Sequence, residues 1–239
     1  MRIDKFLAHT TGQSRTDVKK YLKQKLVKVD DITVTSAGFH VDVDQNVVTL
    51  DGEELFYQQY VYLMMNKPQG YLSATKDGEE QTVIDLLDDY YQRFDLSIAG
   101  RLDKDTEGLL LLTNDGQFLH DVISPRKKVY KKYFCRIEGD FDETGKTALE
   151  SGVTIKDGKD NDYLTVPARI HIISNEEVEI EICEGKFHQV KRMFQSVGCE
   201  VKYLKRLAIG GLELDEYLEL GEYRELAVKE LALIKDGES

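Results

Sequence analysis

The sequence is poor in cysteine, with only Cys135, Cys183 and Cys199 among 239 residues. Their number is odd and no Cys-x-x-Cys pair occurs, which argues against a disulfide framework and against a zinc finger. No apolar run reaches the roughly 18 residues that a membrane-spanning helix needs, and the first residues lack the apolar core of a signal peptide. We therefore expect a cytoplasmic protein with reduced thiols and no membrane insertion.

Motifs for nucleotides and metals are also missing. The chain contains no Gly-x-Gly-x-x-Gly, no Walker-type loop and no His-Glu-x-x-His. Its five histidines show no spacing typical of metal ligands. Nucleotide hydrolysis and zinc chemistry therefore have little support. The apolar share of 41% is still enough to build a folded core.

Negative charge dominates the total, with a formal net charge of −12, but the basic residues are concentrated in three segments. Residues 1–28, 125–136 and 184–206 together hold 20 Lys/Arg and 4 Asp/Glu, whereas the rest of the chain holds 12 and 40. A polyanion binds a local surface, and screening hides charges beyond roughly 8–10 Å, so the acidic total does not exclude nucleic acid. The pattern favours a nucleic-acid-binding face on an otherwise acidic protein, with three unconnected basic surfaces as the alternative.

The N-terminal segment predicts two short helices followed by a strand. Ser14 is a good N-cap for the second helix, whose polar face carries Lys and Arg. Residues 27–29 begin an alternating strand, and residues 42–54 are acidic and rich in turn-forming residues. We therefore expect a small domain over residues 1–58 and a larger one over residues 59–239.

The larger domain mixes strands and helices without a regular repeat. We expect strands over residues 61–65, 109–112, 131–137, 178–183 and 201–207, helices over residues 83–91, 188–197 and 227–234, and a hairpin or turn at residues 114–116. This irregular order favours an α+β fold over a doubly wound sheet.

The most informative segment is residues 99–116, where an acidic loop lies between Gly100 and Gly108, just before an apolar strand. Loops held by a rigid strand often carry function, and either Asp103 or Glu107 could be a catalytic carboxylate. By composition alone, a solvated acidic turn is the better interpretation.

This segment resembles the central motif of bacterial pseudouridine synthases, with Gly100-Arg101-Leu102-Asp103 followed by residues 106–116. Further matching stretches occur in the family's order at residues 1–30, 66–70, 124–133, 184–194 and 206–211. The first of them is similar to the S4 RNA-binding module. The resemblance covers nearly the whole chain. It implies a small S4-type α/β domain and a larger catalytic domain with a central, mainly antiparallel mixed sheet. One departure is the S4 turn, where Asp30-Asp31 replaces the usual Asn-Gly.

The resemblance implies an enzyme that breaks the N1–C1′ bond of a uridine, turns the uracil and rejoins it through C5, with no cofactor and no metal. Asp103 matches the family's essential aspartate, which acts as a nucleophile at C1′ or C6 or as a base for the 2′-proton; the sequence leaves this choice open. Lys191 matches a cation that pairs with this aspartate. Tyr133 matches a tyrosine that stacks on the base or removes its C5 proton. Leu204 matches an apolar residue beneath the base, and Arg101 a residue that holds the site open while the base is everted.

RNA contacts, mostly to phosphates, are implied by the resemblance together with the basic segments. We expect them at Arg2, Ser14, Arg15, Lys19, Lys20, Lys23, Arg126, Lys127, Lys128, Lys186, His188, Gln189 and Arg192. Within the family, the chain is most similar to the branch that modifies 16S rRNA. The expected partner is therefore 16S rRNA or a small-subunit assembly intermediate, bound by a monomer.

Three alternatives remain open at this stage. The first is a sister enzyme that acts on 23S rRNA. The second is a non-catalytic RNA-binding factor in ribosome assembly. The third is a glycoside hydrolase that uses Asp103 and Glu107, which requires two carboxylates roughly 5–10 Å apart. The basic N-terminal module has no purpose in this last interpretation.

Overall fold

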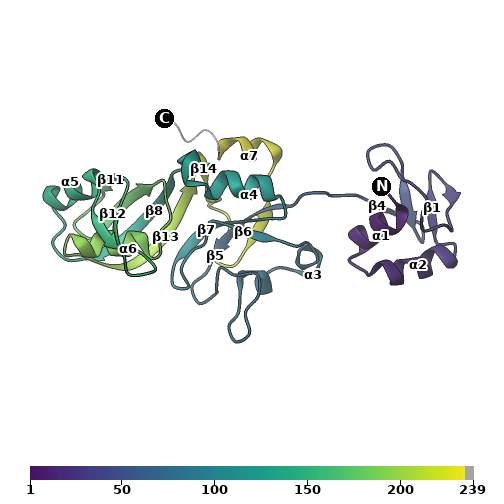
Figure 1. The fold of residues 1–239 in the computed structure, drawn as a ribbon, viewed down its shortest axis with the longest axis horizontal. Coiled ribbons are helices and arrows are strands. Elements are labelled where there is room, and N and C mark those ends of the chain that lie inside the picture. The colour runs from purple at the N-terminus through teal and green to yellow at the C-terminus, as the bar shows by residue number, and fades with distance from the viewer. Residues whose placement is uncertain (235–239) are drawn as a thin grey trace. The chain divides into compact units, whose positions relative to one another are not determined.

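The computed structural model describes residues 1–234, and the chain divides into two compact units between Tyr60 and Val61 (Figure 1). In the first unit, two helices share a buried apolar core with a four-stranded antiparallel sheet of order β2-β1-β3-β4. The elements are α1 (Ile3–Thr11), α2 (Arg15–Lys23), β1 (Val27–Val29), β2 (Ile32–Thr33), β3 (Val48–Leu50) and β4 (Glu53–Leu55).

Helix α2 begins where the sequence predicts it. The hydroxyl of Ser14 accepts a hydrogen bond from the backbone N–H of Asp17 and donates one to the Asp17 carboxylate. Val18 and Leu22 are buried on the inner face of this helix. The outer face is left exposed and carries Arg15, Lys19, Lys20 and Lys23.

The β1–β2 turn keeps a tight geometry although it has no glycine. Asp30 and Asp31 lie in the left-handed region, with φ of 48° and 65°. Aspartate tolerates this region better than most side chains. The Asp30 carboxylate accepts hydrogen bonds from Val47 N at 2.9 Å and from Asn46 Nδ2 at 2.6 Å, which ties the turn to the strand beside it. The missing glycine therefore leaves the turn intact, and it gives one of the two acidic residues a structural role.

The second unit is built on a nine-stranded sheet with the path β11-β12-β8-β13-β7-β5-β15, to which β14 and β6 are added through β13 and β7. Its strands are β5 (Tyr62–Lys67), β6 (Ser97–Ala99), β7 (Glu107–Thr113), β8 (Lys131–Glu138), β11 (Arg169–Ile172), β12 (Glu177–Ile182), β13 (Glu200–Ile209), β14 (Leu212–Glu213) and β15 (Tyr223–Glu225). Among these strands, every pairing is antiparallel except that of β7 with β13. The prediction of an α+β fold with a mainly antiparallel mixed sheet is confirmed.

The parallel junction of β7 and β13 is short and depends on a glycine. Only two residue pairs form it, Glu107 with Lys205 and Gly108 with Arg206. Gly108 has φ of +102°, and a Cβ atom at this position would lie 2.2 Å from the carbonyl oxygen of Arg206. Any side chain at residue 108 would push the two strands apart. This junction divides the sheet into two halves, β11-β12-β8-β13 and β7-β5-β15.

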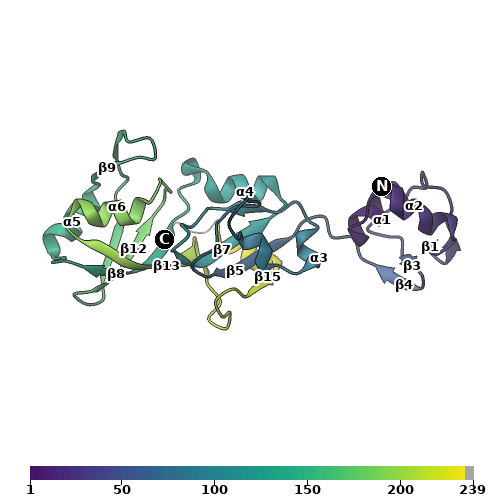
Figure 2. The ribbon, with the colours of Figure 1, turned by 90° about the horizontal axis from the view of Figure 1, so that it is seen from below.

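Helices cover both faces of the sheet. The leucines of β7 alternate between two apolar clusters, because successive side chains of a strand point to opposite faces. Leu110 and Leu112 belong to the larger cluster, and Leu109 and Leu111 to the one that includes Phe118 of α4. Figures 1 and 2 show α5 and α6 at one end of this unit and α3 and α4 at the other. The remaining elements are α3 (Asp89–Gln92), α4 (Gly116–Ile123), α5 (Glu143–Ser151), α6 (Gln189–Ser196), α7 (Val228–Leu233), the 3₁₀ helices at Val83–Leu86 and Pro125–Lys127, and the β9–β10 hairpin (Thr154–Lys156 with Asp162–Leu164).

Two predictions of secondary structure were only partly right. The segment at residues 114–116 bends at Asn114 but forms no hairpin, because α4 begins at Gly116 and the Asp115 carboxylate accepts hydrogen bonds from Gln117 N and Phe118 N. The helix expected over residues 83–91 is interrupted at Leu87, whose backbone is extended. No helix among residues 1–234 has the length and apolar character to cross a membrane.

Candidate active site

A cavity of about 710 Å³ lies where the two halves of the sheet meet. This volume falls within the range of roughly 300–1,000 Å³ that is usual for ligand sites. The loop of residues 100–106 contributes to its lining, as do strands β8 and β13 and the segment 184–191. The cavity brings together all five residues that the sequence suggested for catalysis, namely Arg101, Asp103, Tyr133, Lys191 and Leu204.

The loop that carries Asp103 is held from behind by a buried lysine. Nζ of Lys67 donates hydrogen bonds to the backbone carbonyls of Asp103 at 3.1 Å, Lys104 at 3.3 Å and Thr106 at 2.9 Å. Burial lowers the pKa of Lys67 to about 8. The hydroxyl of Ser73 adds a reciprocal pair of hydrogen bonds with the backbone of residue 102. The loop is therefore anchored by side chains more than 25 residues earlier in the chain.

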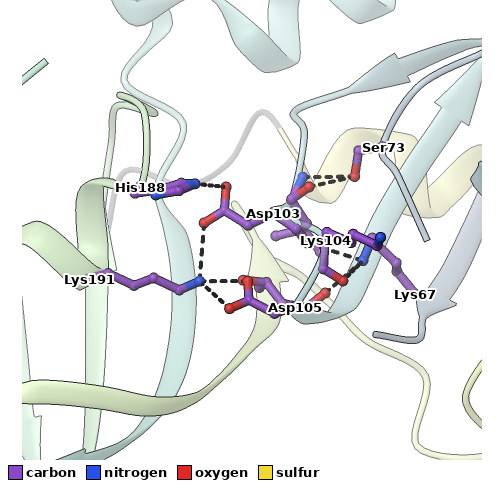
Figure 3. Close-up of polar contacts among 9 residues, drawn as sticks. Lys67, Ser73, Asp103, Lys104, Asp105, His188 and Lys191 are labelled. Atoms are coloured by element: carbon purple, nitrogen blue, oxygen red, sulfur yellow. Dashed lines mark hydrogen bonds and ion pairs between the residues drawn. The ribbon is translucent and has the colours of Figure 1, made fainter. Parts of the chain in front are cut away.

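Each oxygen of the Asp103 carboxylate faces a different nitrogen. Oδ2 lies 3.6 Å from Nζ of Lys191, and Oδ1 lies 3.7 Å from Nε2 of His188. Lys191 makes closer contacts with Asp105, whose two oxygens lie 2.6 and 2.7 Å from Nζ. Figure 3 shows His188 and Lys191 on one side of the carboxylate, with Lys67 and Ser73 on the other side of the loop. The pairing expected between Lys191 and Asp103 is thus shared with Asp105.

Lys191 also changes the pKa of Asp105. Burial acts to raise the pKa of Asp105, but the hydrogen bonds and the charge of Lys191 outweigh burial and lower it. The carboxylate of Asp105 is therefore ionised and fixes the ammonium group of Lys191 beside Asp103. Sequence reasoning did not single out Asp105.

Arg206 is a further buried residue that sequence reasoning did not place in the site. It is 1% exposed and crosses the junction between the halves of the sheet. Its Nε donates to the carbonyl of Leu109 at 2.7 Å, and Nη2 donates to the carbonyl of Gly100 at 2.8 Å. Nη1 lies 3.5 Å from the hydroxyl of Tyr133. Arg206 therefore connects the start of the Asp103 loop to the strand that carries Tyr133. Arg206 is the first residue of the family motif at residues 206–211, and this motif was the sequence signal for its role in the site.

Tyr133 and the nearby Tyr130 have different surroundings. Tyr133 is 8% exposed and lines the cavity together with Leu204. Tyr130 lies outside the cavity lining, and its ring is covered by the guanidinium of Arg169 at 4.1 Å. The structure therefore favours Tyr133 as the tyrosine that meets a ligand.

The carboxylates required by a glycoside hydrolase are not paired in this cavity. Glu107 lies outside the cavity lining and accepts a hydrogen bond from the hydroxyl of Tyr203 at 2.7 Å. Burial and this carboxylate raise the pKa of Tyr203 to about 12. Glu184 does line the cavity, but it accepts hydrogen bonds from Tyr163, Val166 and Gln189. Both glutamates are therefore engaged in hydrogen bonds with other residues, and neither is available as an acid–base partner for Asp103.

The residues expected to bind RNA in the first unit fall into two groups. Arg15, Lys19, Lys20 and Lys23 are exposed on α2, although Lys20 forms an ion pair with Asp17. Arg2 and Ser14 already have structural partners. The guanidinium of Arg2 donates two hydrogen bonds to the buried carboxylate of Asp4, and Ser14 caps α2.

The corresponding residues of the second unit are also divided. Lys186, His188 and Gln189 line the cavity. Gln189 is 3% exposed; its amide accepts from Lys186 N and donates to Glu184, which indicates a structural role. Arg192 lies outside the cavity lining and donates to backbone carbonyls of the β9–β10 hairpin. The exposed basic residues that follow α4 are Arg126, Lys127 and Lys128.

Comparison with known proteins identifies the family. The family model for RNA pseudouridylate synthase matches residues 61–196, and the S4 domain model matches residues 1–47. The chain therefore belongs to the RNA pseudouridylate synthase family and is a pseudouridine synthase, an isomerase, with an N-terminal S4 domain.

Relatives match this chain over its full length. It is 47% identical over 240 residues to the RNA pseudouridine synthase YtzG of Bacillus subtilis, with 99% of both chains covered. It is 40% identical over 235 residues to ribosomal small subunit pseudouridine synthase A of Escherichia coli, covering 98% of this chain and 100% of that one. A crystal structure of a pseudouridylate synthase matches with a TM-score of 0.69 and 34% identity, covering 98% of this chain and 99% of the other.

Proposed function

We propose that this pseudouridine synthase converts a specific uridine of 16S rRNA into pseudouridine, with Asp103 as its catalytic carboxylate. The observation that carries the proposal is the position of Asp103 in a cavity that also contains Tyr133 and Leu204. The choice of 16S rRNA is supported by full-length similarity to enzymes named for the small ribosomal subunit.

The reaction is an isomerisation and needs no oxidant or reductant. The N1–C1′ bond of the uridine breaks, the uracil turns, and a C5–C1′ bond forms. The proton lost from C5 is balanced by the proton gained at N1. A carboxylate serves this reaction as a nucleophile at C1′ or C6, or as a base for the 2′-proton. All three routes use Asp103 as a carboxylate, and Nζ of Lys191 lies 3.6 Å from its Oδ2.

The walls of the cavity suit a flipped nucleoside. Tyr133 presents an aromatic ring for stacking on the uracil, and its hydroxyl is a candidate acceptor for the C5 proton. Leu204 supplies apolar surface to the same cavity. Arg101 is exposed at the cavity and is the residue that we assign to holding the site open while the base enters.

RNA is held, in this proposal, mainly through its phosphates. The exposed basic residues of α2 in the S4 domain and those that follow α4 supply the positive charge. The partner is 16S rRNA or an assembly intermediate of the small subunit, bound by a monomer.

The proposal is tested by tritium release from [5-³H]uridine-labelled 16S and 23S rRNA. The wild type should release tritium from 16S rRNA alone. Asp103→Asn should lower the rate by 10²–10⁴-fold or more, the usual contribution of a general acid or base. Glu107→Gln is the matched control, because this carboxylate lies outside the cavity lining and the variant keeps its acceptor oxygen.

The other outcomes distinguish the alternatives. Release from 23S rRNA alone would keep the chemistry and change the substrate. Absence of release from both RNAs, and from an assembly intermediate with bound ribosomal proteins, would favour the non-catalytic assembly factor.

A further inference from the structure

Phe187 is an exposed aromatic residue at the edge of the active-site cavity. Its side chain is 52% exposed and contributes to the cavity lining. Other aromatic residues with comparable exposure in residues 1–234 are Phe39, Phe56, Tyr60, Tyr90 and Tyr217, and all of them lie outside the cavity lining. A single exposed aromatic residue is ordinary on a protein surface, so the informative feature is that Phe187 lines the same cavity as Asp103.

The ring of Phe187 is held in a fixed stack. The ring of His188 lies nearly parallel to it, with the centroids 3.8 Å apart and an angle of 20° between the planes. The guanidinium of Arg192 lies 5.0 Å from the centroid of the Phe187 ring. Arg192 is itself fixed by hydrogen bonds to the carbonyls of Lys156 and Asp157. The exposed ring is therefore ordered by its neighbours before any ligand arrives.

The backbone beneath this stack is strained. His188 has φ of 51°, in the left-handed region that residues other than glycine seldom adopt. Although His188 is the N-cap residue of α6, its side chain makes no capping hydrogen bond within the described residues. In this backbone conformation the ring of His188 stacks on Phe187, and its Nε2 lies 3.7 Å from Oδ1 of Asp103. Because other residues of the chain such as Asp30 and Asp31 also adopt positive φ, the informative feature at His188 is the position of its ring.

A basic group lies beside the stack. Lys186 precedes Phe187 and lines the cavity, with its Nζ 4.3 Å from the centroid of the Tyr163 ring. Flat aromatic surface next to positive charge is the arrangement by which proteins hold single-stranded nucleic acid, with bases on the rings and phosphates at the cations.

We propose that Phe187 and His188 form a stacking platform for an unpaired nucleobase adjacent to the uridine in the cavity. The ligand is a base of the substrate RNA, so the platform rests on the proposed function. Stacking accepts any of the four bases, because each has a flat π-face. The platform therefore selects a target whose neighbour is free to leave the helix, rather than a particular neighbouring sequence.

The chain contains no tryptophan, which makes a direct test available. Phe187→Trp places a single indole in the platform, and Tyr217→Trp places one at a position that is 84% exposed and outside the cavity lining. Both full-length variants are titrated with the rRNA fragment that supports tritium release, or with 16S rRNA if none does. Filter retention measures binding independently. We expect quenching of the indole at residue 187 and little change at residue 217.

A double-mutant cycle then assigns the contact to a base. An abasic site next to the target uridine should lower the affinity of the wild type by about 5- to 150-fold, the range expected for loss of one stacked base. Phe187→Ala should cause the same loss with intact RNA and no further loss with abasic RNA.

The outcomes separate the platform from the proposed function. Saturable RNA binding without quenching at residue 187, or losses that simply add, would overturn the platform even if pseudouridine forms. Quenching and non-additive losses without pseudouridine formation would support the platform and contradict the proposed function. A wild type that binds no RNA would overturn both.

Discussion

Replacing Gly108 with alanine tests whether the short parallel junction holds the catalytic unit together. A Cβ atom at residue 108 would lie 2.2 Å from the carbonyl oxygen and 2.7 Å from the backbone nitrogen of Arg206. Both atoms belong to a strand, so the overlap is relieved only by moving β13 away from β7. The same alanine would have to adopt φ near +102°.

The expected loss of stability follows from these two costs. A left-handed backbone costs an L-residue about 1–2 kcal/mol. Forcing extra volume into a packed interior costs typically 1–3 kcal/mol. Gly108→Ala should therefore lower the free energy of unfolding by about 2–5 kcal/mol, a large part of the roughly 5–15 kcal/mol that a domain possesses. Activity should fall as well, because Asp103 and Tyr133 belong to the halves that this junction joins.

Urea titration followed by circular dichroism, with hydrogen exchange of residues 107–113 as a local probe, measures this loss. Gly116→Ala is the matched control. A Cβ at residue 116 meets nothing within 4 Å, and the residue lies in the first turn of α4. The control should be neutral or gain about 0.4–1 kcal/mol. Equal stability of Gly108→Ala and the wild type, with unchanged exchange in β7, would refute the argument.

Three further predictions concern the cavity and its support. Burial lowers the pKa of Lys67 to about 8, so the unfolded chain binds more protons than the folded one between pH 8 and 10.5. The free-energy cost of burying protonated Lys67 is fully present below pH 8. The free energy of unfolding of the wild type, relative to that of Lys67→Met, should therefore increase by up to about 3 kcal/mol as the pH rises to 10.5. Urea titrations at pH 7.5 and 10.5 that show no such change would contradict this. Lys191→Met should slow single-turnover tritium release at least as much as Asp105→Asn does, because Lys191 contacts both carboxylates; the reverse order would count against this arrangement. Tyr133→Phe should keep the affinity for RNA but lower the single-turnover rate by about 10²–10⁴-fold, and a rate equal to that of the wild type would remove the hydroxyl from the chemistry.

Local sequence patterns predicted most elements of this fold, because their signals come from neighbouring residues. The Ser14 cap and the apolar spacing that follows it were enough for α2. The run of leucines in β7 predicted a buried strand, although not that it would be covered on both faces. Motifs of fixed order then brought Asp103, Tyr133 and Lys191 into one candidate site.

The errors arose where one pattern suits two structures. Asn114-Asp115-Gly116 fits a hairpin turn, but an aspartate in the same position is also a good helix cap. The apolar residues Phe118 and Val122, spaced as on one face of a helix, were the signal that decides between them.

Other features depend on contacts that sequence patterns do not show. The helix expected over residues 83–91 is interrupted beside Asp88, whose backbone and carboxylate both bond to Tyr223, 135 residues away. A lysine such as Lys67, or an arginine in a basic segment such as Arg206, is most simply interpreted as a phosphate contact. Their partners include backbone carbonyls 36 to 106 residues distant in the chain.

The joining of the cavity from two halves has a consequence for how the protein is made. Translation delivers the Asp103 loop about a hundred residues before Leu204 and Arg206, which complete the opposite wall and tie that loop in place. A nascent chain that has reached only β8 therefore contains the whole S4 sequence and Asp103 but lacks the β13 wall of the cavity. Under the proposed function, RNA binding by the S4 domain and uridine isomerisation are therefore separated in time during synthesis, because the cavity is complete only when β13 docks.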